Sequence, residues 1–332
     1  MRVTFVVVAL NAEACLPALL ADLSAQTYPP EYLEVLLVDS ASVDETRRIM
    51  EAYQDSAPFS VRIYNNPKRW LACGNNIALR AASGDAIIRL DAHARIPPDF
   101  LQKNVDALLR GENIVGGSVL SESPESNWGA ILRSLDESRF CGGAAPFRNR
   151  GESRYVDTLA YAMYRKSVFD RVGFYDERLR RTEDNEMHYR MHQAGFRFCF
   201  CPEIVSTHAA RNTLLGHIRQ KWGNGFWIGK TLHIEPRCFA PRHLAPALFV
   251  LALLSGFFLL PLSPFPLLVL CIVYGIFDLA ATAIAMRTTG PRLLAFLCLP
   301  LLFPLLHIIY GTGTICGLLS PKLNSPTEAY HG

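Results

Sequence analysis

Hydrophobic and polar positions in the first hundred residues repeat a strand-then-helix pattern. Short runs of β-branched and apolar residues, typical of buried strands, alternate with longer segments whose apolar residues recur at helical spacing. The predicted strands are residues 3–9, 34–38, 61–64 and 86–90, and the predicted helices are residues 15–26, 44–53 and 74–82. This alternation predicts an α/β fold with a mostly parallel sheet that is covered by helices on both faces.

Three polar residues stand where predicted strands end. Asn11 follows the first strand, Asp39 ends the second and Asp91 follows the fourth. Ligands of parallel α/β sheets bind outside the carboxyl ends of the strands, so we expect these residues to line one crevice. Ser42 and Glu45 have the spacing of a capping box at the start of the second helix.

Residues 244–319 are almost continuously apolar, and Asp278, Arg287 and Arg292 are their only formal charges. Breaks in this run predict three membrane-spanning helices, residues 244–262, 265–286 and 293–319. At about 1.5 Å per residue, the first two match a hydrocarbon core of about 30 Å. Three such stretches in succession argue against a buried helix of a soluble protein.

Two domains are therefore predicted, residues 1–240 and residues 241–332, with an interfacial segment at about residues 216–240. Arginines flank the turn between the second and third spans, which predicts that this turn and the N-terminal domain are cytoplasmic. We expect a multi-pass protein of the bacterial inner (cell) membrane. Nine scattered cysteines fit a reducing compartment, and a net charge of +3 is too small to indicate nucleic-acid binding.

Several motifs in the first 235 residues resemble glycosyltransferase family 2, whose members have the GT-A fold. They are VVVALNAE at residues 6–13, VDSASVDET at 38–46, ASGD at 82–85, RLDAH at 89–93, and the acidic pair Glu183-Asp184. Their order along the chain is far more specific than any single motif. Within the family, the chain is similar to bacterial succinoglycan-type exopolysaccharide transferases, β-1,3-glucosyltransferases with C-terminal membrane helices.

The resemblance implies that Asn11, Glu13 and Asp39 hold the nucleotide of an activated sugar, with Asp91 beside its diphosphate. A carboxylate at a strand end can accept hydrogen bonds from a base or ribose. The alternative for Asp39 is a turn residue that caps the next helix, and the alternative for Glu13 is a solvated loop position.

Asp91, His93 and His208 are the candidate ligands of a divalent cation. The family has a second aspartate where His93 stands, and an imidazole shifts the preference from Mg²⁺ towards Mn²⁺. We therefore expect Mn²⁺ to serve at least as well as Mg²⁺. The alternative for both histidines is a structural or surface position.

Glu183 and Asp184 match the catalytic acidic pair of the family. The resemblance implies that Asp184 removes the proton from the acceptor hydroxyl and that Glu183 steers the acceptor or shapes its pocket. The alternative is a helix N-terminus rich in acids, because Glu183, Asp184 and Glu186 all favour that end of the helix dipole.

Lys221 and Trp222 partly match the QxxRW segment of the family, in which Ile218 replaces the glutamine. By this likeness both residues lie on the nucleotide-sugar side of the site, where Lys221 would neutralise the leaving phosphate. The incomplete motif argues against a processive polymer synthase.

The sequence thus predicts an inverting, non-processive transferase. It would move one sugar, glucose from UDP-glucose, onto a polyprenyl-diphosphate-linked saccharide in exopolysaccharide biosynthesis. Two alternatives stay open. One keeps the fold and takes polyprenyl phosphate itself as the acceptor, and the other is a catalytically inactive membrane scaffold, which the altered residues 91–93 leave open.

Overall fold

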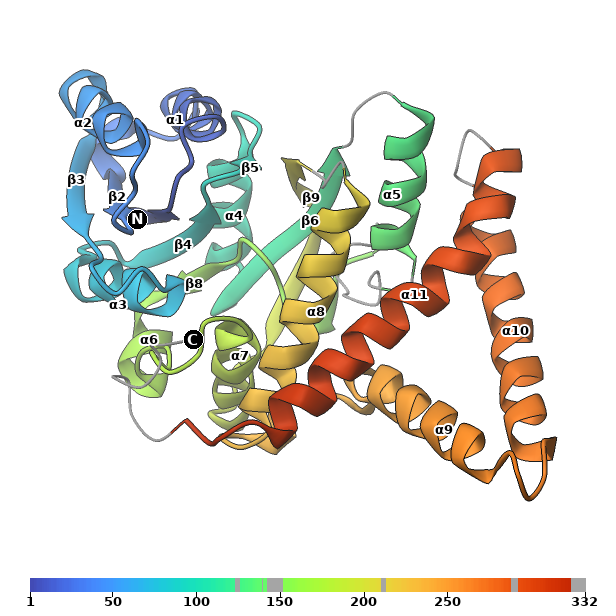
Figure 1. Ribbon diagram of the computed structural model, residues 1–332. Helices are drawn as coiled ribbons and strands as arrows, with labels where there is room; N and C mark the ends of the chain where they lie inside the picture. The colour runs from blue at the N-terminus through green and yellow to red at the C-terminus, as the bar shows by residue number, and fades with distance from the viewer. Residues whose placement is uncertain (123–125, 139, 142–151, 210–212, 288–291, 324–332) are drawn as a thin grey trace. The chain divides into compact units, whose positions relative to one another are not determined.

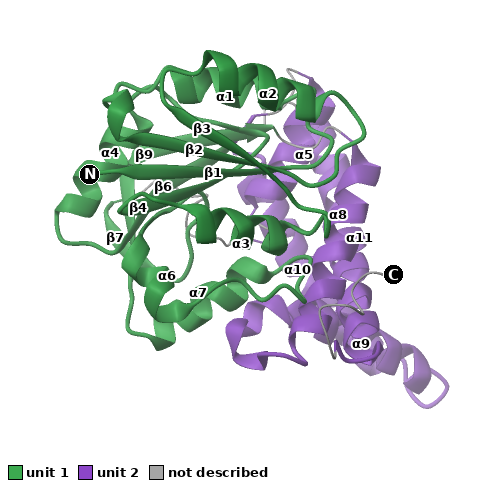
Figure 2. Cartoon of the chain, turned by 90° about the vertical axis from the view of Figure 1, so that its left-hand side faces the viewer, with its two compact units in different colours: residues 1–120, 146–209, 326–332 green, residues 121–145, 210–325 purple. Residues whose placement is uncertain are grey.

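The computed structural model describes residues 1–122, 126–138, 140–141, 152–209, 213–287 and 292–323 (Figure 1). They form two compact units, shown in Figure 2. Unit 1 comprises the described parts of residues 1–120 and 146–209, and unit 2 those of residues 121–145 and 210–325. Residues 213–240 thus belong with the C-terminal helices, whereas the sequence analysis placed them with the N-terminal domain.

The described residues of unit 1 build a nine-stranded sheet with the order β3-β2-β1-β4-β8-β6-β9-β5, and β7 pairs with β9. Strands β1 to β4 pair in parallel, whereas β8 runs antiparallel to β4 and β6, and β9 antiparallel to β5 and β7. The strands are β1 Val3–Ala9, β2 Leu33–Asp39, β3 Ser60–Asn65, β4 Ala86–Asp91, β5 Ala94–Arg95, β6 Ile114–Glu122, β7 Arg154–Val156, β8 Met163–Arg165 and β9 Phe198–Ala209. The predicted α/β class and its parallel first half are confirmed.

Helices cover both faces of this sheet (Figure 2). They are α1 Leu16–Ser24, α2 Thr46–Ser56, α3 Leu71–Ala81, α4 Phe100–Leu109, α6 Lys166–Val172 and α7 Glu183–Gln193. Successive residues of a strand point to opposite faces, so Phe5 and Val7 of β1 pack with α1, α2 and α4, whereas Val6 and Val8 pack in a second core with α3, α6 and α7. The apolar run of β1 is buried on both sides for this reason.

Unit 2 is helical in its described residues. Its α-helices are α5 Asn127–Glu137, α8 Leu214–Thr231, α9 Ala245–Leu259, α10 Phe265–Ala285 and α11 Arg292–Leu319. Glycines bring α8 and α11 into close backbone contact: a Cβ atom at Gly225 would lie 2.1 Å from the Tyr310 carbonyl oxygen, and one at Gly317 would lie 2.0 Å from that of Phe226. Even a methyl group would therefore push these helices apart.

Gly225→Ala is expected to destabilise unit 2 by about 3 kcal/mol, since overpacking at a rigid backbone contact costs that order of free energy. Gly275→Ala is the matched control, because a Cβ atom at Gly275 meets nothing within 4 Å. Thermal unfolding in detergent should show a lowered Tm for the first variant only. Equal Tm values for the two variants would refute this packing.

Two helices in the described ranges are long and apolar enough to cross a membrane. They are α10, with 21 residues, and α11, with 28, and the most apolar 18-residue stretch of each has a mean hydropathy of 2.3. The first predicted span, residues 244–262, contains only the 15-residue helix α9, about 22 Å at the usual rise. The described residues thus contain two helices of spanning length where three were predicted. The turn at residues 288–291 lies outside the described part of the chain.

Candidate active site

The loops after β1 and β2 are tied together by side chains that were expected to hold the nucleotide. Asn11 Oδ1 accepts the Val43 N–H at 2.9 Å, and Glu13 Oε2 accepts the Glu45 N–H at 3.0 Å. Ser42 Oγ accepts the Asn11 N–H at 3.0 Å, so it does not cap α2 as the capping-box spacing had predicted. Asn11 and Glu13 therefore fix the shape of this strand-end loop.

Asp39 is buried at the end of β2 and keeps one carboxylate oxygen available. Its Oδ1 accepts the Ser42 N–H at 3.1 Å, so Asp39 stabilises the turn after β2, as in the alternative considered for this residue. Its Oδ2 has no hydrogen-bond partner among the described residues. Asp39 can thus shape the turn and still accept a hydrogen bond from a ligand.

Next to Asp39, several buried polar atoms lack partners within the described part of the chain. They are Asn66 Oδ1, Trp70 Nε1, and both polar side-chain atoms of Asn75. Asn66 Nδ2 donates to Ser40 Oγ at 3.0 Å, which links this group to the end of β2. Unpaired buried polar groups cost free energy unless a ligand or water pairs with them. Sequence reasoning missed these residues; the signal was the pair of asparagine doublets that bracket the start of α3.

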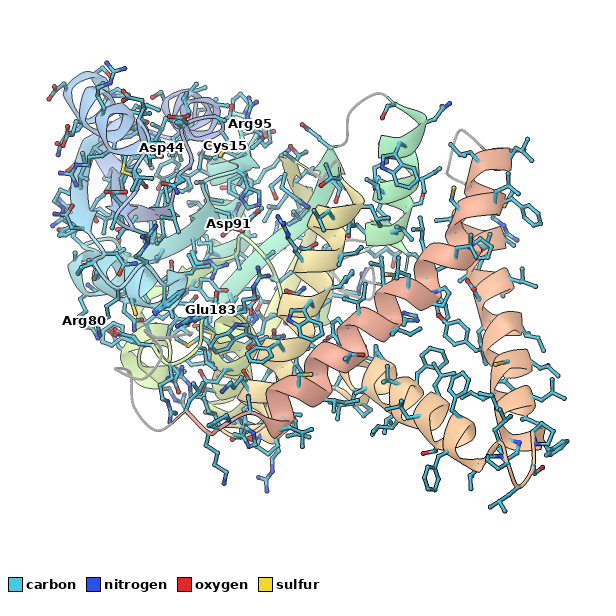
Figure 3. The ribbon with its side chains drawn as sticks, viewed as in Figure 1. Cys15, Asp44, Arg80, Asp91, Arg95 and Glu183 are labelled. Atoms are coloured by element: carbon cyan, nitrogen blue, oxygen red, sulfur yellow. The ribbon has the colours of Figure 1, made fainter. Side chains whose placement is uncertain are left out.

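The carboxylates of β4 and α7 meet at Arg89. The Arg89 guanidinium lies 3.7 Å from Asp91 Oδ1 and 3.4 Å from Glu183 Oε1, although the two acids are far apart in sequence. Figure 3 shows Asp91 and Glu183 in this part of unit 1. Burial opposes the charge of Arg89, but Tyr175 and the carboxylates of Asp91, Glu183 and Asp184 outweigh burial and raise its pKa well above the ordinary value. Arg89 had no role in the sequence analysis beyond its place in the RLDAH motif.

Asp184 is half-buried beside this cluster, at the first turn of α7. Its Oδ1 accepts the Asn185 N–H at 2.8 Å, and its Oδ2 has no partner among the described residues. The residue before the acidic pair, Thr182, has a left-handed backbone with φ of 62°, which is unfavourable for a β-branched residue. Such a conformation is typical of functional sites.

His188 anchors α7 one turn after Asp184. Its Nδ1 lies 2.8 Å from Thr158 Oγ1 and its Nε2 lies 2.9 Å from the Tyr164 hydroxyl of β8. Burial lowers the pKa of His188 to about 4, so the ring is neutral near pH 7. A neutral, doubly bonded ring fixes this helix against the sheet and thereby holds Asp184 in place.

Glu183 is only 4% exposed, and its carboxyl group is difficult to ionise. Burial is the largest cause, followed by the charge of Asp184; Arg89 opposes both, and the net result raises the pKa of Glu183 to about 7. The folded state therefore binds a proton that the unfolded state releases near pH 4.5, so this residue costs stability increasingly as the pH rises from 4.5 through 7.

Glu183→Gln is accordingly expected to stabilise the protein at pH 8 by up to about 3 kcal/mol, and to have little effect at pH 5. Thermal unfolding at the two pH values measures the difference. The same Tm shift at both pH values would show that the carboxylate is not strained in the folded state.

His93 and His208 lie together at the β5–β9 pairing, where His208 stands opposite Ala94. Their ring centroids are 6.1 Å apart. Among the described residues, however, no three His, Cys, Asp or Glu side chains are gathered closely enough to hold a metal ion. The assignment of Asp91, His93 and His208 to a divalent cation therefore stays a prediction.

Lys221 and Trp222 lie on α8, in unit 2. The buried Lys221 Nζ donates to the Cys141 carbonyl oxygen at 3.0 Å, and the Trp222 side chain is 42% exposed. The Lys221 hydrogen bond lies within unit 2, and the roles assigned to Lys221 and Trp222 at the nucleotide-sugar side remain predictions.

Polar strand ends with a charged cluster beside them stand where α/β sheets bind their ligands. The chain matches the profile "Glycosyl transferase family 2" over residues 4–173, just over half of its length. The chain belongs to this family, as its motifs predicted.

Two relatives extend the match beyond that domain. The dolichyl N-acetyl-α-D-glucosaminyl phosphate 3-β-D-2,3-diacetamido-2,3-dideoxy-β-D-glucuronosyltransferase of Methanococcus voltae is 25% identical, over 96% of this chain and 97% of that protein. The succinoglycan biosynthesis protein ExoA of Rhizobium meliloti is 27% identical, over 82% of this chain and 84% of that one.

Solved structures confirm the GT-A-like fold. The mannosyltransferase PcManGT from Pyrobaculum calidifontis, in complex with GDP-Man and Mn²⁺, matches with a TM-score of 0.59 and 18% identity, over 93% of this chain and 86% of that one. S. aureus TarS 1-349 in complex with UDP-GlcNAc matches with a TM-score of 0.53 and 16% identity, over 95% and 91% of the two chains.

Proposed function

We propose that this glycosyltransferase moves one sugar from a nucleotide diphosphate sugar, UDP-glucose, onto a polyprenyl-linked saccharide with inversion at the anomeric carbon. One observation carries the proposal: Arg89 gathers Asp91, at the end of β4, with the acidic pair at the start of α7. An inverting transfer needs a base for the acceptor hydroxyl, and a carboxylate on the donor side can hold a cation beside the diphosphate. The two full-length relatives support the substrate class, since one is named for a dolichyl-linked acceptor and the other for succinoglycan synthesis.

The proposed step is a single displacement in which Asp184 is the base. Its unpaired Oδ2 takes the proton of the acceptor hydroxyl, and the acceptor oxygen forms the new bond to the sugar C1. The bond between C1 and the diphosphate oxygen breaks on the opposite side, and its electron pair leaves with UDP. An α-linked donor therefore gives a β-linked product, and one transfer completes the cycle.

Asp39 and the unpaired atoms of Asn66 and Asn75 bind the nucleotide in this proposal, because they offer acceptors and donors at the strand ends. Asp91, His93 and His208 would hold a divalent cation, Mn²⁺ or Mg²⁺, which offsets the charge of the diphosphate when bound. The presence of Mn²⁺ in complexes of two solved neighbours supports a cation here.

Helices α10 and α11 support a membrane location. Only 11% of the most apolar window of α10 and 28% of that of α11 are buried, so most of their apolar surface needs another covering. We infer that both helices cross the cell membrane and that unit 1 faces the cytoplasm, where nucleotide sugars are made. A polyprenyl-linked acceptor would then lie in the same bilayer as the enzyme.

The test is a donor screen with the full-length protein in membranes and a lipid extract as acceptor source. Mild acid that releases the radiolabelled glucose from the lipid as part of an oligosaccharide supports the proposal, because the glucose is then joined to a saccharide. Release of the label as free glucose favours polyprenyl phosphate as the acceptor, because the glucose is then joined directly to phosphate. No release of UDP from any donor above background would favour the inactive scaffold and refute the proposed activity.

A further inference from the structure

Two polar side chains in the apolar helix α10 are buried, each with a polar atom that has no partner among the described residues. Asp278 is 6% exposed and Thr282 is 1% exposed, and residues four apart lie on the same helix face. Asp278 Oδ1 and Thr282 Oγ1 have no hydrogen-bond partner within the described part of the chain. Burying such groups unpaired costs free energy, and an ionisable residue in a membrane helix usually serves a ligand or a transport path.

A third polar residue continues this face one turn earlier. The Tyr274 hydroxyl lies 2.9 Å from Nδ1 of His307 on α11, and His307 Nε2 lies 2.6 Å from the Phe140 carbonyl oxygen. Because a carbonyl only accepts, Nε2 carries the proton, and Nδ1 accepts the hydrogen bond that Tyr274 donates. Tyr274, Asp278, Thr282 and His307 together form what we call the polar stripe of unit 2.

A cation lies beside the polar stripe. Cys141 follows Phe140 in the chain, and its carbonyl oxygen accepts the hydrogen bond from the Lys221 Nζ. Lys221 is buried, and no carboxylate of the described residues lies within ion-pair distance of it. An ammonium group without a counter-charge can bind a phosphate. The neighbouring Asp136 carboxylate pairs with His217 instead, with Oδ2 at 3.2 Å from the His217 Nε2.

We propose that the polar stripe and Lys221 bind the polar head of the lipid-linked acceptor, with sugar hydroxyls on Asp278 and Thr282 and the lipid phosphate on Lys221. This inference rests on the proposed function and names the acceptor site within it. A carboxylate and a threonine hydroxyl are the groups that pair with sugar hydroxyls. The exposed apolar side chains Leu254 and Phe258 of α9 offer a covering for the polyprenyl chain.

The test compares full-length variants in lipid nanodiscs, with a lipid-linked saccharide as acceptor. Thr282→Val keeps the shape of the side chain, and Asp278→Leu removes the carboxylate. Each is expected to raise the KM for the acceptor by about tenfold, which is the usual loss when a hydrogen bond to a ligand is removed. The KM for the donor should change by less than about twofold. Leu279→Val, on the exposed side of α10, is the control and should change neither constant.

Thermal unfolding separates binding from structure. Because both groups are unpaired in the free protein, the two variants should unfold at the same or a higher temperature than the wild type. An unchanged acceptor KM in both variants, or a lower Tm in step with lost transfer, would overturn the acceptor site. If Asp278→Leu does not fold, the acceptor KM and the Tm of Thr282→Val alone test the acceptor site.

Photo-crosslinking of a lipid-linked saccharide to the protein, without donor, gives a readout that does not depend on turnover. Loss of crosslinking in Thr282→Val, with Leu279→Val unaffected, supports the site, and equal crosslinking in all variants overturns it. If wild-type protein crosslinks the lipid but transfers no sugar, the proposed activity fails while the acceptor site stands.

Discussion

Replacing Asp184 by asparagine is expected to lower kcat for sugar transfer by about a thousandfold, within the range that a general base contributes. The asparagine side chain can keep the hydrogen bond from the Asn185 N–H but cannot take a proton. The KM for the donor should stay within about threefold. Steady-state assay of UDP release against acceptor concentration measures both constants.

Glu186→Gln is the matched control for this prediction, since Glu186 lies in the same turn of α7. Its carboxylate pairs with Arg190 at 2.6 Å, so its loss should lower stability with little change in kcat. If the two variants lose activity alike, or if Asp184→Asn keeps its kcat, Asp184 is not the base. It would then only stabilise the N-terminus of α7 through the helix dipole.

Arg89→Met is expected to lower the free energy of unfolding by about 4 kcal/mol. Removing one partner from a buried ion cluster leaves the others uncompensated, and this costs more than the ion pair itself contributes. Arg89 faces both Asp91 and Glu183, so the variant leaves the buried carboxyl group of Glu183 and the partly exposed carboxylate of Asp91 without their counter-charge. Chemical denaturation in detergent, followed by tryptophan fluorescence, measures the loss.

The double variant Arg89→Met/Glu183→Gln tests the cause. If buried charge is what destabilises the single variant, neutral glutamine should restore about half of the lost stability. Additive losses in the double variant would instead show that Arg89 acts through packing.

The first half of the sheet could be predicted from the sequence alone. Strands β1 to β4 are short apolar runs separated by amphipathic helices, and this local pattern fixes their type and their parallel order. The convergence of strand ends followed from the topology, and Asp39 lies at such an end with an available oxygen. For Asn11 and Glu13 the pattern did not show that the folded loop uses both side chains to accept backbone N–H groups, and their nucleotide-binding role stays a prediction.

Features that depend on contacts between residues distant in sequence could not be predicted from the sequence alone. Arg89 has a role only because α7 packs back against β4, and nothing in the RLDAH motif shows that contact. The end of α9 was misjudged because a continuous apolar run does not reveal where a helix stops. The role of the glycines of α8, which is to let the backbone of α11 come close, is evident only from the α11 carbonyl groups that lie against them.

The most direct measurement is the affinity of two purified variants for UDP, determined by isothermal titration calorimetry with Mn²⁺ present. If Asp91 serves the donor and Asp184 the acceptor, Asp91→Asn should weaken UDP binding by at least about tenfold, whereas Asp184→Asn should bind UDP like the wild type. Equal loss of affinity in both variants, or none in Asp91→Asn, would contradict this division of roles.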